Sequence, residues 1–191
     1  MKRLEECIVK YGKALNKDVL KVDAFLNHQI DPDLMMELGK DFVEHFKDTP
    51  ITKVVTIETS GIAPSVMLGY LLHVPVVFMK KSKSKIVDDN VYTANIHSFT
   101  KGIDYEITCS KDYLAKDDQV LFIDDFMANG EACIGGIKII EQSGASVAGI
   151  GIVIEKAFQP GRKKVEALGY LVYSQARIAS LDKDMITFVE E

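Results

Sequence analysis

Apolar residues recur along the chain at spacings that predict three helices. Asp31 can cap the first helix, and Pro32 suits its first position. The apolar face of this helix repeats at a spacing of four, at Leu34, Leu38, Phe42 and Phe46. The second helix is predicted at 64–72, where proline again stands near the start. The third is predicted at 131–144, where Gly144 ends it.

Short apolar runs between the helices predict strands. They lie at 51–58, 74–79, 105–110, 119–124, 147–155 and 170–178. Because strands and helices alternate, the sequence predicts an α/β fold with a mostly parallel central sheet and helices on both faces. Ligands of such sheets bind beyond the carboxyl ends of the strands. Two loops, 58–63 and 124–131, fall at these ends, so we expect the functional site there.

A long polar segment, 80–104, separates two of the predicted strands. Loops of this length in compact domains are often lids or binding loops. Four lysines make its first part basic, namely Lys80, Lys81, Lys83 and Lys85. We interpret the segment as a functional loop whose middle can form strand pieces. The alternative is a solvated surface loop, because lysine-rich loops usually face solvent.

The composition is that of a globular protein. Of the 191 residues, 47% are hydrophobic and 27% are charged. The net charge of −5 argues against a general nucleic-acid binder, which usually has a basic face. No apolar run approaches the roughly 18–20 residues of a membrane span, and no apolar stretch follows the first three residues as in a signal peptide. We therefore expect one domain over 1–191, in a soluble cytoplasmic protein without a membrane or nucleic-acid partner.

Two adjacent carboxylates, Asp124 and Asp125, follow an apolar strand. Like charges so close repel each other, and burial raises the cost of each charge. A ligand rich in hydroxyls or positive charge is therefore expected beside them. Asn129 and Gly130 then form a turn, and the predicted helix begins at Glu131. The N–H groups of a helix N-terminus bind phosphate, so a sugar phosphate would satisfy both features.

The stretch VLFIDDFMANGEA, at 120–132, resembles the phosphoribosyl diphosphate (PRPP) signature of type I phosphoribosyltransferases. This resemblance implies that Asp124 and Asp125 hold the ribose as catalytic residues. It implies that five residues hold the 5-phosphate, namely Ala128, Asn129, Gly130, Glu131 and Ala132. Many members have threonine where this chain has Asn129, and asparagine can also hydrogen-bond to phosphate. The alternatives are an acidic pair that binds a metal, as in receiver domains, and acids with a purely structural role.

The same resemblance assigns the loop 58–63 to the diphosphate of PRPP, through Thr59, Ser60 and Gly61. Small side chains and open amides suit an anion-binding nest, although a Ser/Gly turn before a helix is commonly just a turn. The segment 80–104 lies where the family has a flexible catalytic lid. Lys81 is expected to neutralise diphosphate there, and closure of the lid would exclude water.

Nearly the whole chain is similar to the xanthine phosphoribosyltransferases of bacteria, for example in SGIAP, DDFMANG, AGIGIVIEK and FQPGR. The family has a hood over the purine, which here corresponds to about 1–35 and 155–191. The purine-binding residues implied are Leu20, Asn27 and Lys156, with Phe158 as a candidate for stacking on the ring. Taken alone, Lys156 could be a surface residue and Phe158 a core residue.

The chemistry of xanthine fits these residues. A buried lysine would favour the 6-oxo group of xanthine and disfavour adenine, whose 6-amino donor would face another donor. Asn27 can offer both a donor and an acceptor to the 2-position. The predicted reaction is xanthine plus PRPP, giving xanthosine 5′-monophosphate and diphosphate. Mg²⁺ is expected as the cofactor, bound mainly through the substrate phosphates rather than by direct protein ligands.

Other functions remain open from the sequence. Guanine, hypoxanthine or adenine could be the base, and a PRPP-sensing regulator could keep the motif without catalysis. Such regulators normally add a winged-helix domain, but only about 50 residues precede the first predicted strand of the sheet. Some purine enzymes of the family have an aspartate at the position of Ala128, so the general base is not assigned. The resemblance also implies a homodimer with the lid near the partner.

Overall fold

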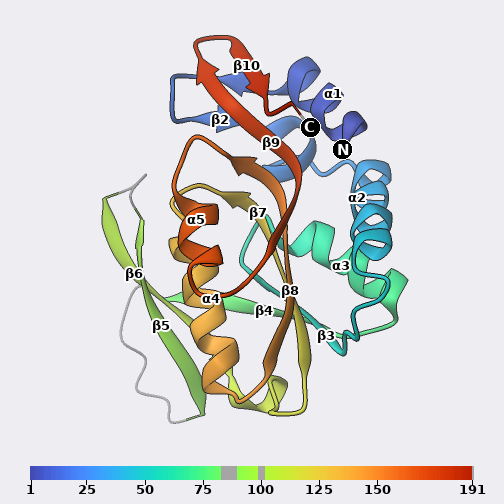
Figure 1. Cartoon of the computed structure of the whole chain (residues 1–191), viewed down its shortest axis with the longest axis vertical. Coiled ribbons are helices and arrows are strands. Elements are labelled where there is room, and N and C mark those ends of the chain that lie inside the picture. The colour runs from blue at the N-terminus through green and yellow to red at the C-terminus, as the bar shows by residue number, and fades with distance from the viewer. Residues whose placement is uncertain (83–89, 99–101, 191) are drawn as a thin grey trace.

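The computed structural model describes residues 1–82, 90–98 and 102–190. Within these ranges the main sheet has eight strands, in the order β10-β9-β8-β7-β3-β4-β6-β5 (Figure 1). The strands are β3 (Lys53–Ile57), β4 (Val76–Ser82), β5 (Val91–Ser98), β6 (Ile103–Ser110), β7 (Gln119–Met127), β8 (Ser146–Lys156), β9 (Val172–Asp182) and β10 (Met185–Phe188). A small second sheet pairs β1 (Lys13–Ala14) with β2 (Leu20–Lys21).

Helices cover both faces of the main sheet. They are α1 (Lys2–Tyr11), α2 (Pro32–His45), α3 (Ile62–Leu72), α4 (Glu131–Gln142) and α5 (Gly161–Glu166), with a π-helix η1 (Asp23–Asn27) and a 3-10 helix η2 (Lys111–Tyr113). In Figure 1, α4 and α5 lie in front of the sheet and α2 and α3 lie to its right. Leu121 and Ile123 of β7 pack in the cluster with α2, whereas Val120 and Phe122 pack in the cluster with α4. Alternate residues of a strand point to opposite faces, so β7 is buried on both sides. The predicted α/β fold is confirmed.

The centre of the sheet is parallel and its edges are antiparallel. β3 pairs in parallel with β4 and β7, and β8 pairs in parallel with β7 and β9. In contrast, β6 runs antiparallel to β4, β5 to β6, and β10 to β9. The prediction of a mostly parallel sheet is therefore confirmed, with antiparallel additions at both edges.

The segment 80–104 contains more regular structure than a loop. It includes the end of β4, all of β5 and the start of β6, and β5 pairs with β6 from Val91 opposite Ser110 to Ser98 opposite Ile103. The rest of the predicted lid, 83–89 and 99–101, lies outside the described residues, and so do Lys83 and Lys85. The function of this segment as a lid stays a prediction.

The predicted helix after Asp31 forms as expected. One carboxylate oxygen of Asp31 accepts hydrogen bonds from the backbone N–H groups of Asp33 and Leu34, both at 3.1 Å. Pro32 occupies the first position of α2. At the end of α4, Gly144 adopts a positive φ of 79°, a conformation that favours glycine.

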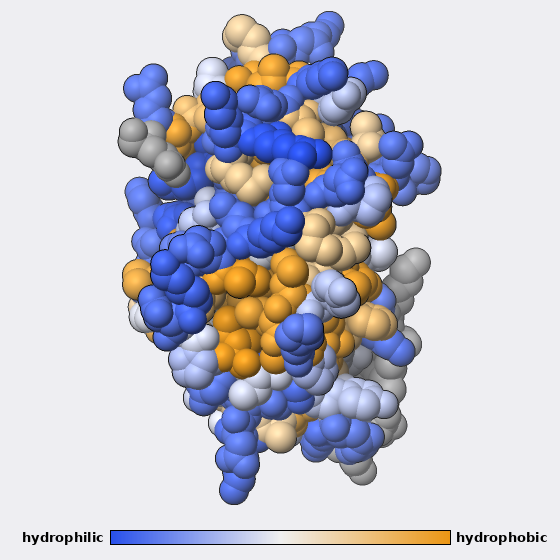
Figure 2. All heavy atoms as spheres, turned by 90° about the vertical axis from the view of Figure 1, so that its right-hand side faces the viewer, coloured by the Kyte–Doolittle hydropathy of each residue, from blue (hydrophilic) through white to orange (hydrophobic). Residues whose placement is uncertain are grey.

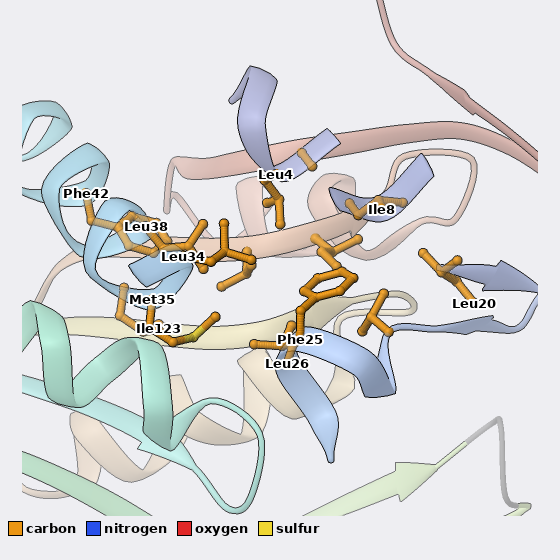
Figure 3. Close-up of a cluster of buried hydrophobic side chains, with 14 of the residues drawn as sticks. Leu4, Ile8, Leu20, Phe25, Leu26, Leu34, Met35, Leu38, Phe42 and Ile123 are labelled. Carbon is orange, nitrogen blue, oxygen red and sulfur yellow. The ribbon is translucent and has the colours of Figure 1, made fainter. Parts of the chain in front are cut away.

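The two ends of the chain meet in the upper part of the molecule in Figure 1. Figure 3 shows side chains of α1, η1 and α2 pointing into one cluster, among them Leu4, Phe25 and Leu34. Ile178 and Leu181 of β9 are buried in the same cluster. The N-terminal segment therefore packs with β9, at one edge of the main sheet, as one unit. Whether this unit acts as a hood over a purine stays a prediction.

One surface of the fold is apolar. α3 has the sequence IAPSVMLGYLL, which contains no charged residue, and Val66 and Tyr70 on it are 47% and 68% exposed. α3 lies on the side of the molecule that Figure 2 shows, where apolar atoms form a patch. None of the helices in the described part of the chain is long and apolar enough to cross a membrane.

Candidate functional site

The carboxylate pair lies near the carboxyl end of β7. This strand extends to Met127, three residues beyond its predicted end at 124, so the pair lies inside the strand rather than after it. Asp124 and Asp125 therefore point to opposite sides. Asp124 is only 6% exposed and Asp125 is half-buried. The backbone N–H of Asp125 donates a hydrogen bond to Oδ1 of Asp124 at 3.0 Å.

The surroundings of Asp124 disfavour its charge. Burial raises the pKa of Asp124 well above its ordinary value, and the neighbouring carboxylate of Asp125 raises it further. The positive charge of Lys81 acts in the opposite direction on this pKa. Tyr105 is close to both Asp124 and Lys81. Burial and the charge of Asp124 raise the pKa of Tyr105, and Nζ of Lys81 lies 5.7 Å from the centre of its ring.

The loop after β7 lines a cavity of about 120 Å³. Its lining includes all five residues predicted to hold a 5-phosphate, namely Ala128, Asn129, Gly130, Glu131 and Ala132. Tyr105, Ile96 and His97 line the facing side. Gly130 has a φ of 83° and directly precedes α4, so this cavity lies at a helix N-terminus. Such a position suits an anion.

The second predicted loop lies at the same edge of the sheet. β3 is parallel to β7, with Val55 opposite Phe122, so the residues after Ile57 lie beside the carboxylate pair. A Cβ on Gly61 would lie 2.1 Å from Oγ1 of Thr56, so a larger residue here would have to displace the Thr56 side chain. Thr59 is exposed and Ser60 is half-buried, and α3 begins at Ile62.

Lys81 is tied to this second loop. Its backbone N–H donates to Oε1 of Glu58 at 2.6 Å. The peptide bond between Glu58 and Thr59 is cis. Since Lys81 also influences the pKa of Asp124, one basic side chain lies near both loops. The structure thus brings together the predicted ribose, 5-phosphate and diphosphate residues.

Lys156, at the end of β8, lies beside the N-terminal segment. Its Nζ donates to the backbone oxygen of Asp18 at 2.5 Å and lies 5.6 Å from the centre of the Phe126 ring. Lys156 is half-buried, and burial lowers its pKa from the ordinary value. Leu20, two residues after Asp18, is buried in the cluster of Figure 3.

The other two predicted purine residues are less enclosed. Asn27 is exposed at the end of η1. Phe158 is 40% exposed in the turn after β8, so the alternative that it is a core residue is wrong. The roles of Leu20, Asn27, Lys156 and Phe158 towards a base stay predictions.

Three residues at the site were not assigned from the sequence. Tyr105 and Phe126 line the cavity. The sequence pattern around them predicts strands but does not indicate that these two side chains face a cavity. Gly161 donates its backbone N–H to the backbone oxygen of Ala128 at 3.0 Å. It belongs to the quoted motif FQPGR, but only the folded chain places it against the loop after β7.

Among the described residues, the histidines and other potential metal ligands do not form a further centre. Nδ1 of His97 lies 2.6 Å from Oδ1 of Asp104, at the rim of the cavity. His45 stacks on Tyr173, with ring centres 3.7 Å apart, and His28 is exposed in the N-terminal segment. In the ranges that the structure describes, no group of three or more His, Cys, Asp or Glu side chains is placed to hold a metal ion.

Comparisons with known proteins agree with this geometry, although no family model matches the chain. A Clostridium botulinum protein named xanthine phosphoribosyltransferase 1 is 57% identical over 190 residues, which are 100% of both chains. A Bacillus mycoides protein named xanthine phosphoribosyltransferase is 57% identical over 191 residues, 100% of this chain and 97% of the relative. Among solved structures, the APRTase from Giardia lamblia complexed with 9-deazaadenine has a TM-score of 0.78 at 24% identity, over 91% of this chain and 97% of its own. At this identity the last likeness shows the fold alone.

Proposed function

This chain belongs to the xanthine phosphoribosyltransferase family, and on that premise we propose that it transfers the 5-phosphoribosyl group of PRPP to xanthine. The products are xanthosine 5′-monophosphate and diphosphate. One observation carries the proposal beyond family membership. Asp124, Asp125, the loop 128–132 and the loop 58–61 meet at one edge of the sheet, beside a cavity at a helix N-terminus.

Each part of PRPP has a proposed partner at this edge. The carboxylates of Asp124 and Asp125 accept hydrogen bonds from the ribose hydroxyls. The backbone N–H groups of 128–132 bind the 5-phosphate, because the positive end of the α4 dipole points into the cavity. Thr59, Ser60, Gly61 and Lys81 bind the diphosphate.

The proposed chemistry is displacement at C1 of the ribose. A ring nitrogen of xanthine attacks C1 while diphosphate leaves from the opposite face. The sugar carries positive charge in the transition state, as in glycoside chemistry. The two carboxylates orient the ribose and stabilise this charge. Closure of the segment 80–104 would exclude water, which otherwise competes for the activated sugar.

Lys156 is proposed to select the base. Its ammonium group lies beside the Phe126 ring and the backbone of Asp18, where it can donate to the 6-oxo group of xanthine. The 6-amino group of adenine would place two donors face to face, which disfavours that base. Asn27 is proposed to contact the 2-position, Phe158 to stack on the ring, and Leu20 to support the hood from its buried position.

Mg²⁺ is the proposed cofactor. The oxygen donors at this edge, from Glu58, Asp124 and Asp125, suit a hard cation. The ion is proposed to be held mainly by the oxygens of the substrate and by water. When bound, the ion would neutralise charge on the diphosphate. The protein would contribute carboxylates that orient the ribose beside it.

The protein is proposed to act as a cytoplasmic homodimer. The uncharged helix α3 exposes Val66 and Tyr70, and an apolar helix face of this kind is stabilised by a partner surface. A second copy of the chain is the proposed partner. Because PRPP carries several negative charges, it does not cross an apolar bilayer unaided, so the enzyme is proposed to work in the cytoplasm, where PRPP is available.

The test is formation of xanthosine 5′-monophosphate from xanthine, PRPP and Mg²⁺, with wild type compared to Asp125→Asn. We expect turnover by wild type and a loss of about a hundredfold or more in kcat/KM in the variant, because a charge that stabilises the transition state is removed. Asp117→Asn, at an exposed carboxylate before β7, is the matched control and should keep wild-type activity. Binding of PRPP by wild type without product from any purine would instead support the regulator.

A further inference from the structure

The turn that begins α5 packs against the loop that lines the cavity. Gly161 is buried, and its backbone N–H donates to the backbone oxygen of Ala128 at 3.0 Å. A Cβ on Gly161 would lie 2.4 Å from that oxygen and 2.9 Å from the backbone nitrogen of Gly130. A Cβ on Gly130 would in turn lie 2.9 Å from Cα of Gly161. The two backbones therefore touch at a pair of glycines, and no side chain fits between them.

Arg162, the next residue, anchors this turn to the sheet. Its guanidinium makes a two-point contact with Glu155 of β8, from Nε to Oε1 at 2.8 Å and from Nη2 to Oε2 at 2.6 Å. Nη1 also donates to the backbone oxygen of Val172 at 2.7 Å. These contacts link the turn to β8 and β9. Two-point contacts of this kind fix orientation as well as distance.

Glu155 is a buried partner for this arginine. It is 2% exposed, and Arg177 of β9 also donates to it, from Nε to Oε2 at 3.2 Å. Burial alone would raise the pKa of Glu155, but hydrogen bonds and charge from Arg162 hold this pKa below its ordinary value. Glu155 is therefore ionised at neutral pH and forms a salt bridge with Arg162.

A further contact joins the other end of the turn to α4. Nζ of Lys164 lies 2.6 Å from Oε1 of Glu131, the first residue of α4. The turn from Pro160 to Lys164 thus contacts the cavity loop at Ala128, Gly130 and Glu131. Its base is fixed to Glu155, which immediately precedes Lys156 in β8.

We propose that Gly161 and Arg162 are positioning residues that hold the 5-phosphate loop at a set distance from the base-binding lysine. This inference rests on the proposed function of the loop 128–132 and of Lys156. Neither residue touches the cavity as part of its lining. They act through the backbone of the loop, by keeping its N–H groups aimed at a phosphate. A misplacement of about 1 Å in such a constellation can cost about a hundredfold in rate.

The test is binding of two small probes, ribose 5-phosphate and Mg²⁺-diphosphate, by calorimetry. In Gly161→Ala we expect the affinity for ribose 5-phosphate to fall about tenfold or more, because the added methyl displaces the loop. The affinity for Mg²⁺-diphosphate should stay within twofold, since the loop 58–61 is not touched. In turnover, KM for PRPP should rise while KM for xanthine changes little.

Two further variants serve as a control and as an alternative to Gly161→Ala. Gly169→Ala is the control for a glycine substitution away from the cavity loop, because no atom lies within 4 Å of its added Cβ, although its positive φ of 91° strains any side chain there. It should lose stability without losing ribose 5-phosphate affinity. Pro160→Gly makes the turn more flexible at an exposed position without changing the charge. It should lower the affinity for ribose 5-phosphate about two- to fivefold. This second variant provides the result if Gly161→Ala does not fold.

The outcomes separate the inference from the proposed function. If wild type neither binds ribose 5-phosphate nor turns over PRPP, the proposed function fails. If wild type does both and the turn variants keep wild-type affinity for ribose 5-phosphate, the positioning role is refuted. Equal losses for ribose 5-phosphate and diphosphate would also refute it, since they would reflect a general loss of structure.

Discussion

Asp124 and Asp125 are identical side chains in different surroundings. The strand alternation buries Asp124 and leaves Asp125 half-buried, and burial raises the pKa of Asp124. In the protein without substrate, the charge of Asp124 is therefore unfavourable. Ribose hydroxyls would donate to this carboxylate and favour its ionised form. Hydrogen bonds from a bound ribose would therefore offset part of the cost of the Asp124 charge.

This burial predicts a stabilising active-site substitution. Since the pKa of Asp124 is higher in the folded than in the unfolded chain, the folded state binds more protons, and this group's contribution to stability falls as pH rises from the ordinary Asp pKa to the raised one. Asp124→Asn removes the charge and should increase the free energy of unfolding at pH 8. The gain should shrink at pH 5. Urea denaturation at both pH values measures it, and a variant less stable than wild type at pH 8 would contradict the assignment.

Lys156 gives a prediction on specificity. Lys156→Met keeps an unbranched side chain, one atom shorter, but removes the donor proposed to face the 6-oxo group. KM for xanthine should rise about tenfold or more, because the oxygen loses a charged partner, while KM for PRPP changes little. Steady-state kinetics with each substrate varied in turn measures the split. Lys163→Met, on the exposed face of α5, is the control. Equal rises in both KM values would remove Lys156 from the base site.

At the scale of elements, the sequence predicts the features that depend on a few neighbouring residues, such as the ends of helices. The cap at Asp31, Pro32 at the first turn of α2 and Gly144 after α4 are all found where the pattern places them. Each depends on one residue and its nearest neighbours. The chain after β3 and the chain after β7 also lie at one edge of the sheet, since parallel strands bring their carboxyl ends together, but the predicted loop 124–131 begins only after Met127.

Other elements could not be predicted because their signals are not local. β1 and β2 are only two residues each, and α1 and η1 depend on burial against β9. The direction of β6 is set by its partner β4, which its own apolar run does not reveal. β7 continues to Met127 because β8 pairs with it as far as Glu155. Gly161 gains its role only when α5 packs on the cavity loop.

The cap of α2 predicts a change in stability without a change in chemistry. Asp31→Ala removes the acceptor for two backbone N–H groups and should lower the free energy of unfolding by about 0.5–2 kcal/mol. Urea denaturation gives this value. Activity per folded molecule should be unchanged, because α2 lies away from the cavity. Asp33→Ala, two residues further along in the first turn of α2, is the comparison. A change within error of zero would show that the cap contributes nothing.

At the scale of the whole molecule, α3 connects the site to the surface. Its N-terminus follows the loop 58–61, and its outer face carries the exposed Val66 and Tyr70. A partner on this face would therefore lie close to the proposed diphosphate loop. If the proposed dimer forms through this face, its formation and the activity of the site are expected to depend on each other.

This arrangement predicts that charge on α3 separates the subunits. Val66→Glu together with Tyr70→Glu places two like charges in the proposed apolar contact and should convert a dimer into a monomer. Sedimentation velocity on wild type and variant measures the change. Lys40→Glu on α2, an exposed position outside the apolar face, is the control. A wild-type protein that sediments as a monomer at micromolar concentration would contradict the homodimer.

The central claim is that this PRPP site serves xanthine. It is tested most directly by competition, with xanthine, guanine, hypoxanthine and adenine at equal concentration in one reaction with limiting PRPP and Mg²⁺. The ratio of nucleotides formed gives the ratio of kcat/KM values without separate assays. The account predicts that xanthosine 5′-monophosphate is the main product and that the adenine nucleotide is the least abundant. A mixture dominated by the guanine or adenine nucleotide would contradict the assignment of Lys156 and of the base.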